Sequence, residues 1–462
     1  MKDAFLDRDA ELTRLRDAWQ RAVAGQPQLI VVWGRRRVGK TYLLAHFTDG
    51  KRTVFHGSTE QSEAVELGRL GESVARGLGA RILDAAGGRF ATWEAALRFF
   101  AAQATEQPLA VVLDEVPYLA RSTPGFTSVV QAVWDHLAAP NHLFLVLNGS
   151  ATGVMERMLG AGGSLRGRPT ESIRIDPLDP WAARMFLPSL APAEFVEAYA
   201  ACGGYPLHLR AWDQSLSVQA NLARLAGTPG GLLLDDALGI LREELPESGG
   251  YARILAAIGR GRHRYGAIAS EAGQRIEHAL EVMVAAGFVR RAVPVGAPAG
   301  AKPLYDIADP YLSFWFETLY ADVAQIEAGQ GKQVLDRARP RWARHVGAVF
   351  EEIARFHARR EASWGSLPDD LVIGRWWSAT GEPAEIDVLG LRGARTQLVG
   401  EARWQARPIN LRDLHELQMR ARRTPKPAAD LINAFWSRSG AEPEVVRAGA
   451  RAYDIGEMID GG

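Results

Sequence analysis

The chain has very little cysteine, no excess charge of either sign and no long apolar run. Cys202 is the single cysteine among 462 residues, which excludes an intramolecular disulfide and any metal site built from a cysteine cluster. Lysine and arginine total 54, as do aspartate and glutamate, so no global electrostatic field favours nucleic acid. Any basic surface must therefore be local.

Membrane and export signals are also missing from the sequence. No uninterrupted apolar stretch approaches the roughly 20 residues needed to cross a bilayer. The opening residues MKDAFLDR have charges where a signal peptide would need an apolar core. We therefore expect a cytoplasmic protein with no membrane partner. A chain of this length should form about three domains, each with its own core.

The most informative feature that is present is a glycine-rich loop. Residues 34–41 read GRRRVGKT and match G-x-x-x-x-G-K-[ST] at every fixed position, after an apolar strand-like run and before a helical pattern. In such a loop the backbone N–H groups surround phosphate, Lys40 approaches the β- and γ-phosphates, and the Thr41 hydroxyl binds Mg²⁺. The predicted nucleotide-binding residues are Gly34, Arg35, Arg36, Arg37, Val38, Gly39, Lys40 and Thr41.

Polar residues follow two further apolar runs. Asp114 and Glu115 come directly after one run, at a separation from the loop that suits an NTPase: the first carboxylate would hold Mg²⁺ and the second would polarise the attacking water. Asn148 follows the next run and could sense the γ-phosphate or orient water. A solvated turn is the alternative interpretation of both segments.

The apolar pattern divides the chain into regions. Residues 1–187 alternate strand-like and helix-like stretches, as a parallel α/β sheet requires. Residues 188–248 have a mostly helical pattern, and residues 309–462 begin with an aromatic helix and become strand-rich after a helix at 341–360. The expected strands of the first region are Leu29–Trp33, Thr53–Phe55, Leu109–Leu113, Leu143–Leu147 and Ser172–Ile175.

Residues 249–308 have a different rhythm. Helical patterns at 251–258, 265–271 and 274–286 precede two short strand patterns at 288–293 and 303–307, which together predict a winged helix. Basic residues between the first two helices are placed to contact phosphate. They are Arg260, Arg262, His263 and Arg264. A winged helix used only for protein packing is an equal alternative, because the expected recognition helix is not strongly basic.

A constellation of charged residues lies near the C-terminus. Glu351 and Glu352 belong to the expected helix, and Asp387 to a strand. Glu401 and Arg403 end the next strand and point to one face because they are two residues apart. Carboxylates placed in this way can hold Mg²⁺ and generate hydroxide for phosphodiester cleavage, although an ion-paired strand surface is the plainer interpretation.

Several sequence blocks, in order, resemble archaeal-type ATPases of the STAND group, within the AAA+-like P-loop class. The blocks are FLDRDAEL at 5–12, the loop at 34–41, DE at 114–115, NGS at 148–150, GR at 167–168, GGYP at 203–206 and DPYLSFW at 309–315. The resemblance implies a P-loop NTPase core that uses ATP and Mg²⁺, a helical lid, a winged helix and a nuclease-like C-terminal domain. It also implies that Arg168 reaches the γ-phosphate, whereas an exposed, solvated arginine is the alternative. Members of this group are often slow switches, so a hexameric motor is not implied.

The C-terminal constellation resembles the PD-(D/E)xK nuclease core of restriction-endonuclease-like domains. Asp387 and Glu401 match its metal-binding pair, and Glu351 its helix carboxylate, but Arg403 stands where the motif has lysine. Because the metal-binding pair is present, we expect Mg²⁺ binding to be retained. Cleavage is not expected with the same strength, because arginine cannot deprotonate and has a different shape from lysine. A basic tail favours a DNA-facing surface, although Asp413 and Glu416 interrupt it. Its members are Arg407, Arg412, Arg420, Arg422, Arg423 and Lys426.

Two functional hypotheses follow from the sequence. The first is an ATP-hydrolysing switch that controls a nuclease-like, DNA-contacting domain. The second is a nucleotide-gated regulator or scaffold that only binds DNA or protein. Oligomerisation and a protein partner are compatible with both.

Overall fold

The computed structural model describes residues 7–461 except 86, 139, 151, 246–247, 274, 299 and 379–382. The chain divides into two compact units. Unit 1 comprises Met1–Pro177 with Ile240–Pro246, and unit 2 comprises Leu178–Gly239 with Glu247–Gly462. Within the described residues, helices that combine the length and the apolar character needed to cross a membrane are absent.

Unit 1 is built around a parallel sheet with the strand order β2-β3-β4-β1-β5. Its strands are β1 Gln28–Trp33, β2 Thr53–Gly57, β3 Leu109–Asp114, β4 Leu143–Gly149 and β5 Glu171–Arg174. Its helices are α1 Asp9–Val23, α2 Lys40–Thr48, α3 Glu63–Leu78, α4 Ala80–Ala85, α5 Trp93–Gln103, α6 Val116–Ser122, α7 Phe126–Asp135 and α8 Thr152–Leu159. Every expected strand therefore forms, with bounds within two residues of the prediction.

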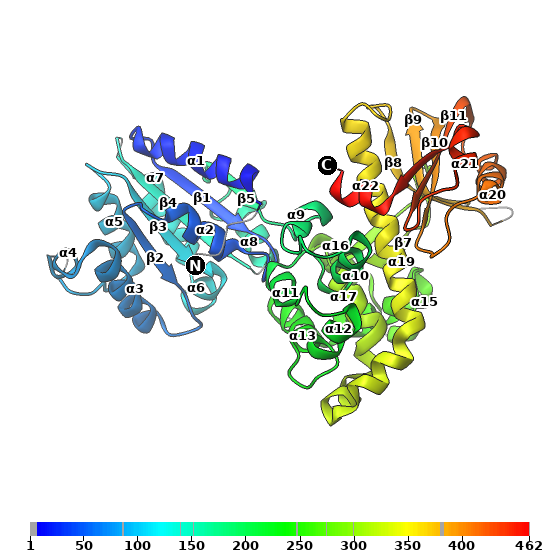
Figure 1. Ribbon diagram of the computed structural model, residues 1–462. Helices are drawn as coiled ribbons and strands as arrows, with labels where there is room; N and C mark the ends of the chain where they lie inside the picture. The colour runs from blue at the N-terminus through cyan, green and yellow to red at the C-terminus, as the bar shows by residue number, and fades with distance from the viewer. Residues whose placement is uncertain are drawn as a thin grey trace. The chain divides into compact units, whose positions relative to one another are not determined.

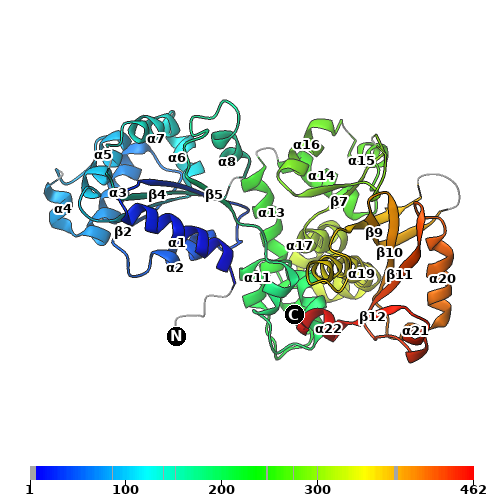
Figure 2. The same ribbon diagram turned by 90° about the horizontal axis from the view of Figure 1, so that it is seen from above.

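The central strands are apolar up to the polar residues at their carboxyl ends because helices cover both faces of the sheet. All residues of β3 and β4 are buried. Helices α1 and α2 lie on one face, and α5, α6 and α7 lie on the other (Figure 2). A hydrophobic core cluster lies under the second group and includes Trp93, Phe100 and Phe126. Because the strands are parallel, the loops after β1, β3 and β4 meet at the same edge of the sheet.

Unit 2 begins with helices that pack around a long central helix, α19 (Figure 1). The elements are α9 Pro180–Arg184, α10 Pro192–Cys202, α11 Pro206–Ala211, α12 Val218–Leu225, α17 Pro310–Phe314, η1 Trp315–Leu319, η2 Tyr320–Asp322, α18 Val323–Gln325, η3 Ile326–Gln330 and α19 Gly331–Ser363. Helix α13, Leu232–Glu244, contributes residues to both units. The aromatic segment at 311–316 is core, as expected, since Tyr311, Phe314 and Trp315 are buried.

Short sequence motifs fix the ends of these helices. Asp309 accepts a hydrogen bond from the Leu312 N–H at 3.0 Å, and Pro310 follows it at the first helical position, so the DPYL segment caps α17. Gly204 is required by close packing, since a Cβ atom there would lie 2.1 Å from the Leu178 carbonyl oxygen.

The region expected to be a winged helix contains helices α14 Ser248–Gly259, α15 Tyr265–Ala272 and α16 Glu277–Ala285, followed by strands β6 Val289–Ala292 and β7 Leu304–Ile307. The two strands pair antiparallel, with Val289 opposite Ile307. The order of elements is therefore the expected one.

The C-terminal part of unit 2 contains a mixed sheet with the order β12-β11-β10-β9-β8. Strands β8, β9 and β10 are antiparallel neighbours, whereas β10, β11 and β12 are parallel. Helix α19 lies against one face and α20 against the other (Figure 2). The elements are β8 Val372–Trp377, β9 Glu385–Arg392, β10 Arg395–Arg403, α20 Leu411–Ala421, β11 Pro427–Ser437, α21 Pro443–Arg447, β12 Arg451–Asp454 and α22 Ile455–Asp460.

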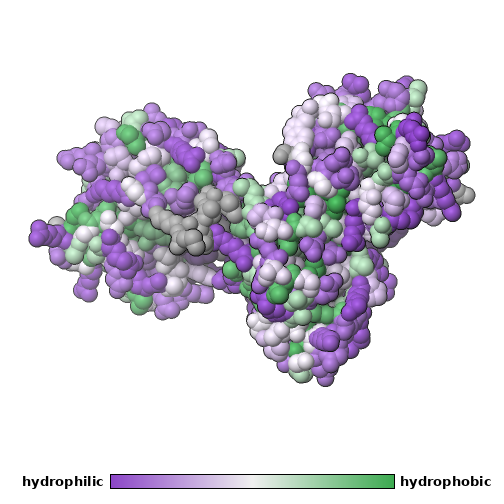
Figure 3. Space-filling model, in the orientation of Figure 1, coloured by the Kyte–Doolittle hydropathy of each residue, from purple (hydrophilic) through white to green (hydrophobic). Residues whose placement is uncertain are grey.

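On the face shown in Figure 3, hydrophilic side chains predominate and hydrophobic ones are scattered in small groups. The division into domains at 1–187, 188–248, 249–308 and 309–462 remains a prediction.

Candidate functional site

The glycine-rich loop joins β1 to α2 and has the backbone geometry that its glycines allow. Gly34 has φ +149°, and a Cβ atom there would lie 2.1 Å from the Ile175 carbonyl oxygen, so no larger residue fits. Gly39 has φ +94° and precedes Lys40, the first residue of α2. The positive end of that helix and the loop N–H groups form an anion-binding site.

Lys40 is folded back onto the loop. Its Nζ donates to the carbonyl oxygens of Gly34 at 2.9 Å and Arg35 at 2.8 Å, and the residue is only 5% exposed. Burial lowers the pKa of Lys40, and the nearby carboxylates, first Glu115 and then Glu244, counter that effect. The ammonium group is therefore held in a water-poor position between acidic groups, where a phosphate would be a strong partner.

Asp114 ends β3 beside the loop. Its Oδ2 accepts a hydrogen bond from Thr41 Oγ1 at 2.8 Å, and its Oδ1 accepts one from Asn148 Nδ2. Burial raises the pKa of Asp114, whereas the Thr41 hydrogen bond opposes that rise. A carboxylate and a hydroxyl that already face each other are hard oxygen donors of the kind Mg²⁺ prefers, so these two residues fit an Mg²⁺ bound with nucleotide.

Glu115 lies next to Asp114 in a strained backbone conformation, with φ +57°. Its carboxylate accepts hydrogen bonds from Ser150 Oγ at 2.6 and 2.7 Å and from the Ser150 N–H at 3.3 Å. The side chain faces a cavity of about 310 Å³. The other lining residues are Glu60, Pro117, Tyr118, Arg121, Ser150, Arg242 and Glu243.

Sequence reasoning missed the acidic residues that end α13. The Arg36 N–H donates to Glu244 Oε1 at 3.1 Å, and the Arg36 guanidinium forms an ion pair with Glu243. These glutamates lie more than 200 positions from the loop. No motif contains them, so only the folded chain reveals that they reach the phosphate loop.

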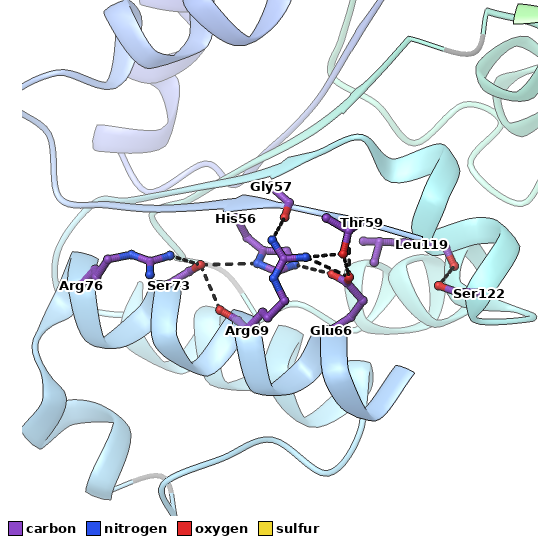
Figure 4. A network of polar contacts seen from close by, with 9 residues as sticks. All are labelled: His56, Gly57, Thr59, Glu66, Arg69, Ser73, Arg76, Leu119 and Ser122. Carbon is purple, nitrogen blue, oxygen red and sulfur yellow. Dashed lines mark hydrogen bonds and ion pairs between the residues drawn. The ribbon is translucent and has the colours of Figure 1, made fainter. Parts of the chain in front are cut away.

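A buried polar network supports the same edge of the sheet at the end of β2 (Figure 4). Glu66 on α3 accepts a hydrogen bond from the Thr59 N–H at 3.1 Å and contacts His56 Nε2 at 3.2 Å. Burial lowers the pKa of His56, against the opposing effect of Glu66. The adjoining Ser58 N–H donates to the Asp114 carbonyl oxygen at 3.0 Å, so the network fixes the loop beside the candidate Mg²⁺ ligand.

Among the predicted catalytic residues, Arg168 is bound to residues outside the phosphate-loop site. Its guanidinium forms a bidentate pair with Asp135 of α7, at 2.9 and 2.8 Å, and also donates to the Ser164 carbonyl oxygen. Asp114, Glu115 and Asn148 thus come together beside Lys40 and Thr41, whereas Arg168 is held by α7.

The C-terminal constellation is also assembled, but as a network of ion pairs. Asp387 Oδ2 on β9 accepts a hydrogen bond from the Ala402 N–H at 3.0 Å. Glu401 is 1% exposed and forms ion pairs with Arg403 and Arg420. Burial raises the pKa of Glu351 to about 8, and the neighbouring Asp387 adds to the rise.

Arginines extend this network on the side of α19. Arg355 donates to the Asp387 carbonyl oxygen at 2.9 Å and pairs with Glu352 at 2.8 Å. Glu352 also pairs with Arg290 at 2.9 Å. Within the described residues, the structure contains no group of three or more His, Cys, Asp or Glu side chains placed to hold a metal ion. With guanidinium groups on Glu401, this arrangement does not fit an Mg²⁺ between Asp387 and Glu401.

The basic residues expected to face nucleic acid are largely paired with acids. Arg260 and Arg262 both bind Glu271, and His263 pairs with Asp306 at 2.9 Å, which raises the pKa of that histidine. In the basic tail, Arg407 binds Asp413 and Arg412 binds Glu416. Arg422 and Lys426 are exposed.

Residues 5–211 match a family model described as an ATPase domain predominantly from Archaea. This part of the chain is an archaeal-type P-loop ATPase domain. Residues 315–418 match a second family, described as archaeal and bacterial proteins of unknown function. The expected P-loop ATPase core is thereby confirmed, together with its use of ATP.

The chain also resembles individual proteins over most of its length. An uncharacterized protein of Methanocaldococcus jannaschii is 25% identical over 413 residues, which are 87% of this chain and 88% of that protein. A Walker-type ATPase of Pyrococcus abyssi shares the fold with a TM-score of 0.51 and 19% identity, over 68% of this chain and 97% of that chain. The Aeropyrum pernix ORC2 protein, solved as ADPNP–ADP complexes, aligns with a TM-score of 0.44 and 14% identity, over 71% and 97%.

Proposed function

We propose that this chain is an ATP-hydrolysing switch that uses Mg²⁺. The observation that carries the proposal is the convergence of Lys40, the Thr41–Asp114 pair and Glu115 at the edge of the sheet where the phosphate loop lies. Lys40 would bind the terminal phosphates, and Thr41 with Asp114 would hold Mg²⁺, which supplies charge neutralisation when bound.

Glu115 would orient and deprotonate the attacking water, and Asn148 would hold Asp114 in position. In this structure the Glu115 carboxylate accepts hydrogen bonds from the Ser150 hydroxyl. These hydrogen bonds must break before the carboxylate can accept a proton from the attacking water. This restraint supports slow turnover, as expected of a switch rather than a motor.

Phosphate release from ATP by wild type, Lys40→Ala and Lys51→Ala tests the proposal. Lys51 follows the same helix and donates to the Phe47 carbonyl oxygen, so its loss controls for removal of a lysine without touching the site. Slow, Mg²⁺-dependent release by wild type and Lys51→Ala, with none above background by Lys40→Ala, is the expected result. Equal release by all three proteins would contradict it.

We infer that the second unit is the output of this switch and contacts DNA. The succession of α14, α15, α16 and the β6–β7 hairpin supports a winged helix at 249–308. The mixed sheet between α19 and α20, with Glu351, Asp387 and Glu401 on neighbouring elements, supports a restriction-endonuclease-like fold within 309–462. A cavity of about 740 Å³ between these parts is lined by more arginines than carboxylates, although several of these arginines are ion-paired. Its arginines are Arg260, Arg262, Arg290, Arg341, Arg344, Arg355 and Arg375.

A specific observation favours DNA or protein binding without cleavage as the second candidate function. The ion pairs of Glu401 with Arg403 and Arg420 occupy the carboxylate that would otherwise bind the catalytic metal. Plasmid incubated with Mg²⁺ and ATP separates the two functions, with Asp387→Ala as the control. Cleavage that Asp387→Ala abolishes would establish the nuclease, whereas a nucleotide-dependent gel shift without cleavage would establish the binder.

A further inference from the structure

Helix α13 ends in two glutamates, which is electrostatically unfavourable for a helix. The C-terminal end of a helix carries partial negative charge, which favours lysine or arginine there and disfavours carboxylates. Glu243 and Glu244 are nevertheless the last two residues of α13, and Glu244 is only 5% exposed. Their position therefore depends on partners outside the helix.

The phosphate loop provides these partners. The Arg36 N–H donates to Glu244 Oε1 at 3.1 Å, and the Arg36 side chain pairs with Glu243. After Glu115, Glu244 is the carboxylate that most raises the pKa of Lys40. Glu244 thus accepts a hydrogen bond from a backbone N–H of the anion-binding loop and interacts electrostatically with Lys40. A nucleotide phosphate would be expected to make the same two interactions.

We propose that Glu244, supported by Glu243, is an internal carboxylate that competes with the phosphates of the nucleotide for the loop. The inference rests on the proposed ATP binding at this loop and adds its regulation. Because two anions cannot share the same donors without strong repulsion, nucleotide binding displaces Glu244 and the last turn of α13. Residues 232–239 of the same helix belong to unit 2, so the displacement acts on the chain segment that joins the units.

The test is ATP affinity, measured by isothermal titration calorimetry with Mg²⁺ present. Glu244→Gln keeps the size of the side chain and an acceptor oxygen but removes the charge, and it should bind ATP about tenfold more tightly than wild type, or ~1.4 kcal/mol. Glu244→Asp keeps the charge on a shorter side chain and should give an intermediate gain. Asp235→Asn removes an exposed carboxylate from the same helix and should leave the affinity unchanged.

The outcomes separate this inference from the proposed function. Equal affinities of wild type, Glu244→Gln and Glu244→Asp, together with weaker binding by Lys40→Ala, would overturn the competing carboxylate while ATP binding stands. Weaker binding by Glu244→Gln would show that Glu244 assists the nucleotide, which also overturns the inference. No binding by any of these folded proteins would overturn the proposed function itself. Thermal unfolding midpoints show whether each variant is folded. If Glu244→Gln does not fold, the comparison of ATP affinity is made between wild type and Glu244→Asp.

Discussion

Replacing Glu115 by glutamine isolates the chemical step from nucleotide binding. Glutamine has nearly the same shape, and its amide oxygen can still accept a hydrogen bond from Ser150, so the side chain should stay in place. What is lost is the charge that lets the group accept a proton from water. A general base contributes about 10²–10⁴-fold to a rate, which corresponds to roughly 3–5 kcal/mol of transition-state stabilisation.

The same substitution should leave ATP affinity unchanged or slightly raise it. Glu115 is the carboxylate with the largest effect on the pKa of Lys40, so its charge acts where the phosphates would bind. Removing a negative charge next to an anion site reduces repulsion of the incoming nucleotide. The predicted signature is therefore a large loss of turnover without a loss of affinity.

Phosphate release at saturating ATP and equilibrium ATP binding measure the two effects on one protein preparation. Glu60→Gln is the matched control, because Glu60 lines the same cavity but is exposed and pairs with Arg121 at 3.2 Å. Glu60→Gln should turn over at the wild-type rate. Wild-type turnover by Glu115→Gln would refute the assignment of the base.

Other predictions concern the C-terminal region. His357 Nδ1 accepts a hydrogen bond from the Trp436 indole at 3.1 Å, and burial lowers the pKa of His357 from 6.5 to about 4. Stability should therefore fall as pH drops from 6.5 towards 4, and His357→Gln should flatten that fall in thermal melts. Glu351 has a pKa raised from 4.5 to about 8, so stability should decline as pH rises through that window. Glu351→Gln should raise the melting temperature at pH 8 but not at pH 4.5, and an equal effect at both values would count against the burial argument. Plasmid cleavage should be weak or absent in wild type, because Arg403 and Arg420 both pair with Glu401. Arg403→Lys removes one of these guanidinium groups and restores the lysine of the motif, so any cleavage should be higher in that variant. Robust wild-type cleavage abolished by Asp387→Ala would show that arginine suffices.

The sequence predicted the ATPase core well because its physical signals are local. Strands β1, β3 and β4 are continuous apolar runs because both faces of a parallel sheet are covered, and each run ends in the residues that form the site. Gly34 is required by its contact with Ile175, so the loop pattern reflects a steric demand. Such local features can be read without knowing the tertiary structure.

Helix α19 shows where a local rule misleads. The predicted helix spanned 341–360, and Pro340 just before it is a residue that normally ends or kinks a helix. The structure continues the helix from Gly331 to Ser363 through that proline. Packing of α19 against the surrounding helices and the mixed sheet outweighs the hydrogen bond lost at one position.

Charge pairing between distant segments could not be predicted from the sequence. The pattern placed Glu401 beside Arg403 but did not show that Arg420, on α20, would bind the same carboxylate. Likewise, the sequence suggested Arg168 as a catalytic arginine but did not indicate that the fold would pair it with Asp135. Each pairing depends on which faces of separate elements meet, and a single sequence does not record that.

ATP binding at the loop 34–41 should depend on the ammonium group of Lys40. Calorimetric titration of ATP with Mg²⁺ into wild type and Lys40→Ala tests it most directly. We expect saturable binding by wild type and an affinity lower by about 10–100-fold in Lys40→Ala, the loss expected for a charged hydrogen-bond donor to phosphate. Equal affinity of the two folded proteins, or no binding by wild type, would contradict it.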